Sequence, residues 1–232
     1  MTSQKIAIGL IAFALFIGSV TAHAADFSVG VNAYQRGDYT TALQIFRQFA
    51  DQGDASAQNN LGLMYDKGQG VAQDYAAAVR WFRKAADQNH ADAQFNLGVM
   101  YKRGEGVTQD YKAAMRWFRK AEDQGDASAQ TALGVMYAKG QGVAQDYKAA
   151  VMWFRKAADQ GYAIAQAFLG LVYHFGNGVT QDYVQAHMWY SLAAAQGEKD
   201  ASKGRDILAE KMTPAQIAEA QKLARYWKPK GK

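Results

Sequence analysis

The sequence predicts an all-α solenoid of helix-turn-helix repeats, 36 residues each, with about twelve helices. The first observation is a segment, GVTQDYKAAMRWFRKAEDQG, which starts at Gly106 and recurs at Gly70, at Gly142 and, more loosely, at Gly178. The second is that the apolar residues of each copy recur with the spacing of a packed helix face. The third is a pair of glycines that separates two helical stretches in every copy and lets the chain turn back.

The first helix of a repeat is represented by residues 91–102, where Ala93, Leu97 and Met100 form an apolar stripe. Gly98 interrupts this helix, although glycine destabilises a helix interior by about 1 kcal/mol relative to alanine. We therefore expect the second helix to approach closely here, with the repeat tryptophan or tyrosine packed on the glycine backbone. The structural repeat positions are Gly62, Gly98, Gly134 and Gly170 and, on the second helix, Trp81, Trp117, Trp153 and Trp189.

The second helix follows an aspartate that is suited to cap it, such as Asp110, because a carboxylate accepts hydrogen bonds from the free backbone N–H groups. The same place is taken in the other copies by Asp74, Asp146 and Asp182. At the other end, we expect Gly125 to occupy the C-cap. Each repeat is thus bounded by its own helix start and stop signals.

The second helix also interleaves aromatic and basic residues, a pattern found on nucleic-acid-binding surfaces. The aromatic residues recur within the apolar stripe, which favours core packing over base stacking. The basic residues are balanced, since Arg119 precedes Asp123 by four positions and the other copies repeat this pairing, so we expect a solvated face with weak ion pairs. The formal net charge of +5 is mild and spread along the chain. No nucleic-acid partner is therefore expected.

The pattern A-x-x-x-L-G-x-x-Y-x-x-G-x-G-V-x-x-D-Y-x-x-A-x-x-W-F-x-x-A-A-x-Q-G, seen from Ala129 to Gly161, resembles the Sel-one-like repeat family, a relative of the tetratricopeptide repeats. Four full units extend over residues 58–197. The resemblance implies a right-handed α/α superhelix that acts as a binding scaffold for a protein or peptide. It does not name the partner.

The segments on either side of the full units depart from the pattern. Residues 25–57 are expected to form a shortened, tetratricopeptide-like first repeat, because the double-glycine loop is missing. Residues 198–232 are expected to form two capping helices that cover the last repeat. The first is predicted over residues 199–211, and the second is predicted to start at a capping box at Thr213, with a proline next, and to reach about Trp227.

Residues 1–24 have the pattern of a signal peptide: Lys5, an apolar run over residues 6–20 and a cleavage signal at Ala22-His23-Ala24. The alternative is an uncleaved anchor, although the run is shorter than the roughly 20 residues of a membrane span. The sequence contains no cysteine, and no later segment is long and apolar enough to span a membrane. We expect an exported protein, periplasmic in a Gram-negative bacterium, with secretion as an alternative.

Residues for catalysis are few. Beyond the signal peptide the histidines are His90, His174 and His187, and their spacing is not that of metal ligands. No Ser-x-x-Lys motif or phosphate-binding loop is present. We therefore expect that the protein is not an enzyme, that it has no catalytic or metal-binding residue, and that it needs no cofactor. The alternatives are a joint metal or acid–base site of His174 and His187, and an envelope hydrolase or metal-dependent enzyme.

Positions that differ between the repeats are the candidates for binding, because the shared fold explains the positions that stay the same. In superhelical α/α repeats the first helices line the concave face, so their variable side chains would form a groove. Its polar end is expected to select a ligand and its apolar end, Phe168, His174 and Phe175, to anchor it. One alternative is that the differences between repeats are neutral variation on a solvated surface. Another is that the C-terminal helices cover Phe168 or Phe175. The predicted partner-binding residues are Asn59, Asp66, Phe95, Lys102, Phe168, His174 and Phe175.

These observations together favour a non-catalytic adaptor of the bacterial cell envelope that binds a protein or peptide in its concave groove. A secreted factor that acts on host or neighbouring cells would use the same scaffold. Under either function, the oligomeric state of the protein and the identity of its partner do not follow from the sequence.

Overall fold

The computed structural model describes residues 27–230, and within that range every regular element is a helix. A helical stretch over residues 27–35 precedes eleven further helices, which makes twelve in the described part of the chain. The all-α repeat architecture and the expected number of helices are therefore confirmed. The bounds are α2 Tyr39–Asp51, α3 Ala55–Lys67, α4 Tyr75–Asp87, α5 Ala91–Arg103, α6 Tyr111–Glu122, α7 Ala127–Lys139, α8 Tyr147–Asp159, α9 Ala163–Phe175, α10 Tyr183–Ala195, α11 Lys199–Ala209 and α12 Pro214–Tyr226.

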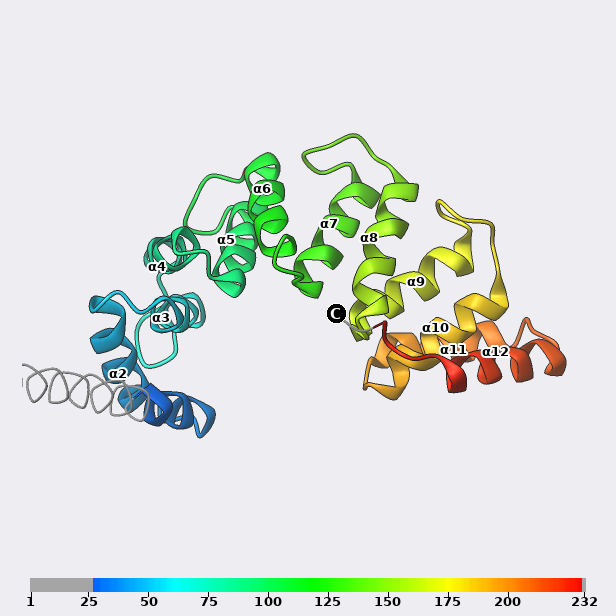
Figure 1. Ribbon diagram of the computed structural model, residues 1–232, viewed down its shortest axis with the longest axis horizontal. Coiled ribbons are helices and arrows are strands. Elements are labelled where there is room, and N and C mark those ends of the chain that lie inside the picture. The colour runs from blue at the N-terminus through cyan, green and yellow to red at the C-terminus, as the bar shows by residue number, and fades with distance from the viewer. Residues whose placement is uncertain (1–26, 231–232) are drawn as a thin grey trace, which may run out of the picture. The chain divides into compact units, whose positions relative to one another are not determined.

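The chain forms two compact units, which divide within α5. The first holds the described residues up to Ala93 together with Glu105–Val107, and the second holds Gln94–Gly104 and the residues from Thr108 onward. In the second unit the pairs α7–α8 and α9–α10 follow one another, and α11 and α12 both pack on α10 (Figure 1). The predicted signal peptide, residues 1–24, lies outside the described residues.

The close helix approach predicted at the repeat glycines is present, but the aromatic residue on each glycine is not the tryptophan. A Cβ atom added at Gly62 or Gly134 would lie 2.6 or 2.5 Å from the ring of Phe82 or Phe154. In the last repeat Tyr190 takes this place against Gly170. The correction has a geometric cause, because neighbouring residues on a helix point about 100° apart, and the residue after the tryptophan is the one that faces the first helix.

Three of the four repeat tryptophans instead lie at the edge of the core, whereas Trp189 is buried within it. Trp81 and Trp117 are half-buried, and the ammonium groups of Lys84 and Lys120 each lie 4.2 Å from the centre of the corresponding indole. These lysine–tryptophan contacts are cation–π interactions on a solvated face. The prediction that the recurring aromatic residues pack in the core therefore applies to the phenylalanines more than to the tryptophans.

The aspartate caps are found where the sequence predicts them. The carboxylates of Asp74 and Asp110 accept hydrogen bonds from the backbone N–H of Ala77 and Ala113 at 2.8 and 2.9 Å. Asp146 and Asp182 cap α8 and α10 in the same way. The expected C-cap at Gly125 is wrong, because α6 ends at Glu122 with Asp123 as its C-cap, and Gly125 follows with a φ of +85°. The glycine is needed for the left-handed turn after the cap.

Arg119 and Arg155 of the second helices each contact a tyrosine of the next repeat. The guanidinium of Arg119 donates to the hydroxyl of Tyr137 at 3.1 Å, and Arg155 donates to Tyr173 in the same way. Among the described residues, the ion pair formed by Asp159 is with Lys230, at 2.8 Å. For Arg119 and Arg155, the side-chain hydrogen bonds that the structure shows therefore join successive repeats.

A glutamine of each first helix is buried and hydrogen-bonded to the glutamine at the end of the second helix of its repeat. The amide nitrogens of Gln88 and Gln124 lie 2.8 Å from the amide oxygens of Gln58 and Gln94. The pairs Gln160–Gln130 and Gln196–Gln166 have the same bond at 2.9 Å. These bonds satisfy the buried acceptors that the repeat would otherwise leave unpaired.

The last two helices bury an apolar face against α10. Leu208, Met212 and Ala220 form one cluster with Ala186 and Tyr190. The expected capping box is present, since Thr213 and Gln216 exchange hydrogen bonds and Pro214 opens α12. The first of the two helices is shorter than predicted and ends at Ala209. No helix in residues 27–230 combines the length and hydropathy that crossing a membrane requires.

Candidate partner-binding site

Helix α9 differs from the other first helices on one face. Where α3, α5 and α7 carry Ser56, Asp92 and Ser128, α9 carries Ile164. Where they carry Lys67, Arg103 and Lys139, it carries Phe175. Ile164 and Leu171 are each 41% exposed and Phe175 is 59% exposed. Because seven and four residues separate them, these three side chains share a face of the helix, and we call them the α9 stripe.

A pocket of about 340 Å³ lies beside the α9 stripe, between α9, α10 and the start of α11. Its apolar wall is formed by Ile164, Ala167, Phe168, Leu171 and Tyr190. Burial raises the pKa of the Tyr190 hydroxyl to about 12, so this wall stays neutral at pH 7. The charged side chains that line the pocket are two carboxylates, Glu198 and Asp200. The pocket is thus apolar inside and acidic at one edge.

Phe168 is less available than the sequence predicts. Its ring stacks on Phe154 with centroids 4.8 Å apart and an interplanar angle of 9°, and it is half-buried against the core of the α8–α9–α10 cluster. Phe95 of α5, which stands at the repeat position of Ala167, is also half-buried, with its ring 5.6 Å from that of Phe118. Phe168 therefore packs on the preceding helix pair as well as lining the pocket, whereas Phe95 packs on the second helix of its own pair.

His174 is buried, with 8% of its surface exposed, and its imidazole ring stacks against the ring of Phe175. The two rings stack at 4.5 Å with an interplanar angle of 7°, while Tyr183 and Tyr190 meet the imidazole edge-on at 5.8 and 6.3 Å. Burial, and then the charge of Lys211, lowers the pKa of His174, so the imidazole is uncharged at pH 7. A direct contact of His174 with a partner is not supported by this burial.

The predicted polar residues lie elsewhere. Asn59 is 5% exposed, so its side chain is packed rather than presented at the surface. Asp66 and Lys102 are half-buried, and burial followed by the charges of Lys139 and Arg103 lowers the pKa of Lys102. The backbone carbonyls of both residues accept a hydrogen bond from the glutamine of the following loop, Gln73 or Gln109. Contact of Asp66 and Lys102 with a partner stays a prediction.

Of the predicted set, the structure brings Phe168, His174 and Phe175 together on α9. Sequence reasoning missed Ile164 and Leu171, although the comparison of repeats contains the signal for Ile164, which replaces serine or aspartate. It also missed the acidic edge, because Glu198 and Asp200 lie where the repeat pattern fades.

His174 and His187 contact different groups. His187 lies 3.3 Å from the hydroxyl of Ser191, whereas His174 lies among aromatic rings. Within residues 27–230, no three His, Cys, Asp or Glu side chains are grouped as metal ligands would be.

Helix pairs that recur every 36 residues, joined by double-glycine loops and by bonds from one pair to the next, define an α/α repeat protein. The family model that matches is the Sel1 repeat, at residues 24–54, 55–90, 91–126, 127–162 and 163–198. The chain belongs to the Sel1 repeat family, as the resemblance indicated. Proteins of this family are generally non-catalytic scaffolds for protein interaction.

Two solved structures support this assignment. A Sel1 repeat protein from Oxalobacter formigenes is 37% identical with a TM-score of 0.75, over 86% of this chain and 83% of that one. A protective antigen of uropathogenic Escherichia coli is 34% identical with a TM-score of 0.73, over 89% of this chain. The chain spans about half the length, 46%, of that antigen. An immunity protein from Pseudomonas aeruginosa, 23% identical with a TM-score of 0.56 over 85% of this chain and 78% of that one, shares the fold. A search of curated proteins found no match.

Proposed function

We propose that this protein is a non-catalytic scaffold that holds a peptide segment of a partner protein against the α9 stripe. The observation that carries the proposal is the exposure of Ile164, Leu171 and Phe175, two of which stand where the other repeats have polar residues. A cluster of exposed apolar side chains beside a pocket is typical of a protein contact site. Burying one such side chain stabilises a complex by about 1.5–3 kcal/mol.

The pocket beside the stripe sets the chemistry of the segment. Glu198 and Asp200 place negative charge at its edge, and burial lowers the pKa of His174 on α9, which disfavours a compensating positive charge there. Lys203 partly offsets this charge through its ion pair with Asp200 at 3.2 Å. The segment that fits best carries apolar side chains for the pocket and at least one Lys or Arg for the carboxylate edge.

The proposed destination is the cell envelope, reached by export. The N-terminal pattern of residues 1–24 supports export, and the description of the related Escherichia coli protein as a protective antigen favours a location outside the cytoplasm. Secretion into the medium is the alternative destination. Fractionation of the producing cells, with N-terminal sequencing of the purified protein, tests both: an unprocessed chain in the cytoplasm overturns the export proposal.

The binding proposal is tested with residues taken from the protein's own repeats. Ile164→Ser with Phe175→Lys restores the residues found at these positions in α7, so the fold is expected to persist. Met152→Arg is the matched control, because Met152 is 56% exposed on α8, and Arg80 and Arg116 stand at its position in other repeats. Both variants add one positive charge.

A protein retained by the wild-type chain from a cell extract is identified, purified and titrated against each form by calorimetry. We expect the double variant to bind at least about tenfold more weakly and the Met152→Arg control to bind as the wild type does. Equal affinity of the wild type and the double variant overturns the proposal.

A further inference from the structure

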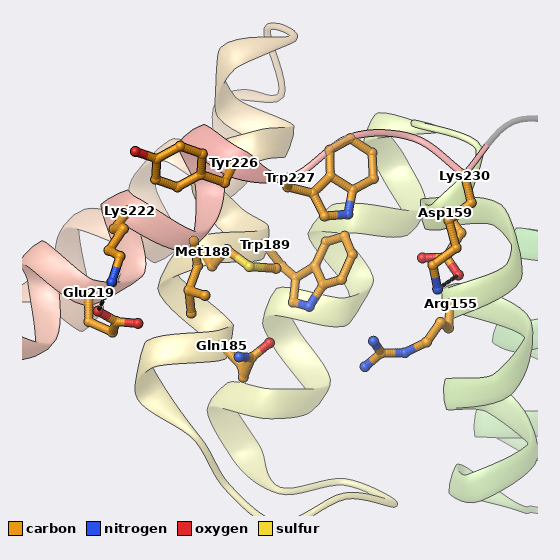
Figure 2. Close-up of a pocket in the computed structure, with 11 residues that line it drawn as sticks. Arg155, Asp159, Gln185, Met188, Trp189, Glu219, Lys222, Tyr226, Trp227 and Lys230 are labelled. Atoms are coloured by element: carbon orange, nitrogen blue, oxygen red, sulfur yellow. Dashed lines mark hydrogen bonds and ion pairs between the residues drawn. The ribbon is translucent and has the colours of Figure 1, made fainter.

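A second pocket, of about 450 Å³, lies in the same unit on a different set of surfaces. It is lined by the second half of α8, by α10, by α12 and by the tail that follows α12 (Figure 2). The residues that matter are Arg155, Gln185, Met188, Trp189, Tyr226 and Trp227. Neither the α9 stripe nor the proposed partner segment is involved, so the inference stands independently of the proposed function.

The tail makes this pocket specific to the last repeat. The backbone N–H of Lys230 donates to the carbonyl of Asp159 at 2.7 Å, and its ammonium group pairs with the Asp159 carboxylate at 2.8 Å. This anchor holds Trp227 over Trp189, with the ring centroids 5.9 Å apart and an interplanar angle of 70°. In earlier repeats a lysine covers the equivalent tryptophan, whereas here the lysine is replaced by Leu192. The tail therefore adds a wall, with Trp227 and Lys230, to the pocket beside the last helix pair.

Trp189 carries a hydrogen-bond donor without an acceptor. Trp189 lines the pocket and is 2% exposed, yet its indole Nε1–H has no hydrogen-bond partner. Buried donors are almost always paired, and leaving one unpaired is destabilising. The unpaired N–H indicates that a bound acceptor completes this pocket.

Two further donors lie beside it. The guanidinium of Arg155 is 5.6 Å from the centre of the Trp189 ring, and Gln185 precedes Trp189 by one helical turn on α10. Figure 2 shows the guanidinium, the indole nitrogen and the Gln185 amide on the same side of the pocket. Among the described residues, no carboxylate is within ion-pair distance of Arg155; its hydrogen bond to Tyr173 uses one of five N–H groups.

The net charge of the side chains that line the pocket indicates which kind of hydrogen-bond acceptor would bind there. Lys222 and Lys230 are paired with Glu219 and Asp159, at 3.7 and 2.8 Å, so the surplus in the pocket is the single charge of Arg155. A singly charged anion would neutralise it, whereas a doubly charged phosphate group would leave an excess negative charge beside Asp159 and Glu219. A carboxylate matches the planar guanidinium and can accept from the indole as well.

We propose that this pocket binds a carboxylate attached to an apolar group. The carboxylate accepts from Trp189 Nε1–H, Arg155 and the Gln185 amide, and the apolar group lies against Met188 and Trp227. The carboxylate can belong to a small acid or to the C-terminus of a peptide, since both present the same chemistry.

The test follows the indole N–H resonance of Trp189 by nuclear magnetic resonance, assigned from its loss in Trp189→Phe. The probes are N-acetyl-leucine, its amide, which lacks the charge, and a pentapeptide that ends in a free leucine carboxylate. We expect the acid to shift the Trp189 resonance at millimolar concentration and the amide to leave it unchanged. Tighter binding of the pentapeptide than of the acid would assign the site to peptide C-termini, and equal binding would assign it to small acids.

Variants separate the binding role from a structural one. Arg155→Gln is expected to weaken binding of the acid at least about tenfold, and Arg119→Gln, which removes the equivalent bond to Tyr137, is expected to leave it unchanged. Gln185→Ala serves as a second variant if Arg155→Gln does not fold. A Trp189 resonance that neither carboxylate probe moves, an equal response to acid and amide, or binding unchanged in both pocket variants overturns the proposal.

Discussion

The backbone of Gly98 lies directly against the ring of Phe118: a Cβ atom added to the glycine would come within 2.6 Å of Cε1 of that ring. Phe118 is fully buried, so its ring cannot move aside into solvent. The same contact recurs in every full repeat, with Tyr190 in place of phenylalanine in the last one. This contact sets how closely the two helices of a repeat approach.

Gly98→Ala is expected to destabilise the protein by about 1–3 kcal/mol, since the added methyl group overpacks the core. The sign is diagnostic, because the same change in an unconstrained helix interior is stabilising. Urea unfolding of the wild type, Gly98→Ala, Phe118→Leu and the double variant measures both the loss and its coupling to the ring. A Gly98→Ala variant as stable as the wild type would contradict this packing.

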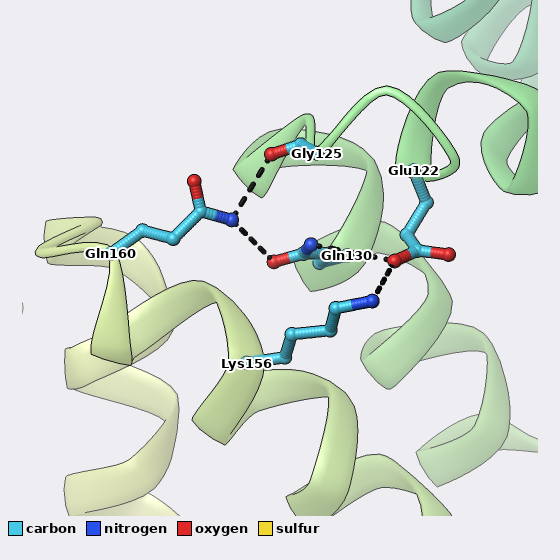
Figure 3. A network of polar contacts seen from close by, with 5 residues as sticks. All are labelled: Glu122, Gly125, Gln130, Lys156 and Gln160. Carbon is cyan, nitrogen blue, oxygen red and sulfur yellow. Dashed lines mark hydrogen bonds and ion pairs between the residues drawn. The ribbon is translucent and has the colours of Figure 1, made fainter. Parts of the chain in front are cut away.

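Glu122 is the one carboxylate residue that is buried among residues 27–230. Glu122 stands where Ala86, Ala158 and Ala194 stand, and its side chain is only 9% exposed. It pairs with Lys156 of the next repeat and lies 3.5 Å from the amide nitrogen of Gln130 (Figure 3).

Lys156→Met is therefore expected to destabilise the protein by about 1–2 kcal/mol, less than for a fully buried pair because the lysine is half-exposed. In a Glu122→Ala background, which restores the residue of the other repeats, the same change is expected to be nearly neutral. Chemical denaturation of the four chains gives the coupling. Equal losses in the two backgrounds would show that the pair does not hold the two repeats together.

The pH dependence of stability is expected to follow buried His187. Burial, and then the charge of Arg205, lowers its folded-state pKa from the usual value of 6.5, although Asp206 and a backbone hydrogen bond act in the opposite direction. At lower pH the unfolded chain binds a proton that the folded chain does not, so this contribution is present above about pH 6.5 and is lost as the pH falls through the folded-state pKa.

We expect Tm to fall between about pH 7.5 and about pH 5.5, and to fall less in His187→Val. Valine stands at the equivalent positions 79 and 151, so the variant suits the fold. Differential scanning calorimetry at both pH values provides the comparison. An identical fall in the wild type and the variant would exclude His187 as a cause.

The cap at Asp110 provides a local test of the repeat. Its carboxylate accepts a hydrogen bond from Ala113 N at 2.9 Å, so Asp110→Ala is expected to cost about 1 kcal/mol of unfolding free energy. Asp110→Asn, which keeps an acceptor, should lose much less. If urea denaturation finds the two variants equally stable, the cap is not the reason for the aspartate.

Much of the fold follows from the sequence because the period, the capping aspartates and the glycine loops are local signals. The residue that packs on Gly98 does not follow, since Trp117 and Phe118 are neighbours and only the rotation of the helix decides between them. The site is predicted in part: differences between repeats point to α9 and Phe175. They cannot show that Phe168 stacks on Phe154 or that His174 is buried, because both depend on packing against other helices.

The proposed binding surface is best tested by placing a photo-reactive phenylalanine analogue at position 175 and, in a second chain, at position 152 in the producing cells. We predict that the chain with the probe at 175 cross-links to one protein, at a segment with apolar side chains and a Lys or Arg, and that the chain with the probe at 152 does not. The absence of any adduct at 175, or the same adducts at both positions, would contradict a binding role for the α9 stripe.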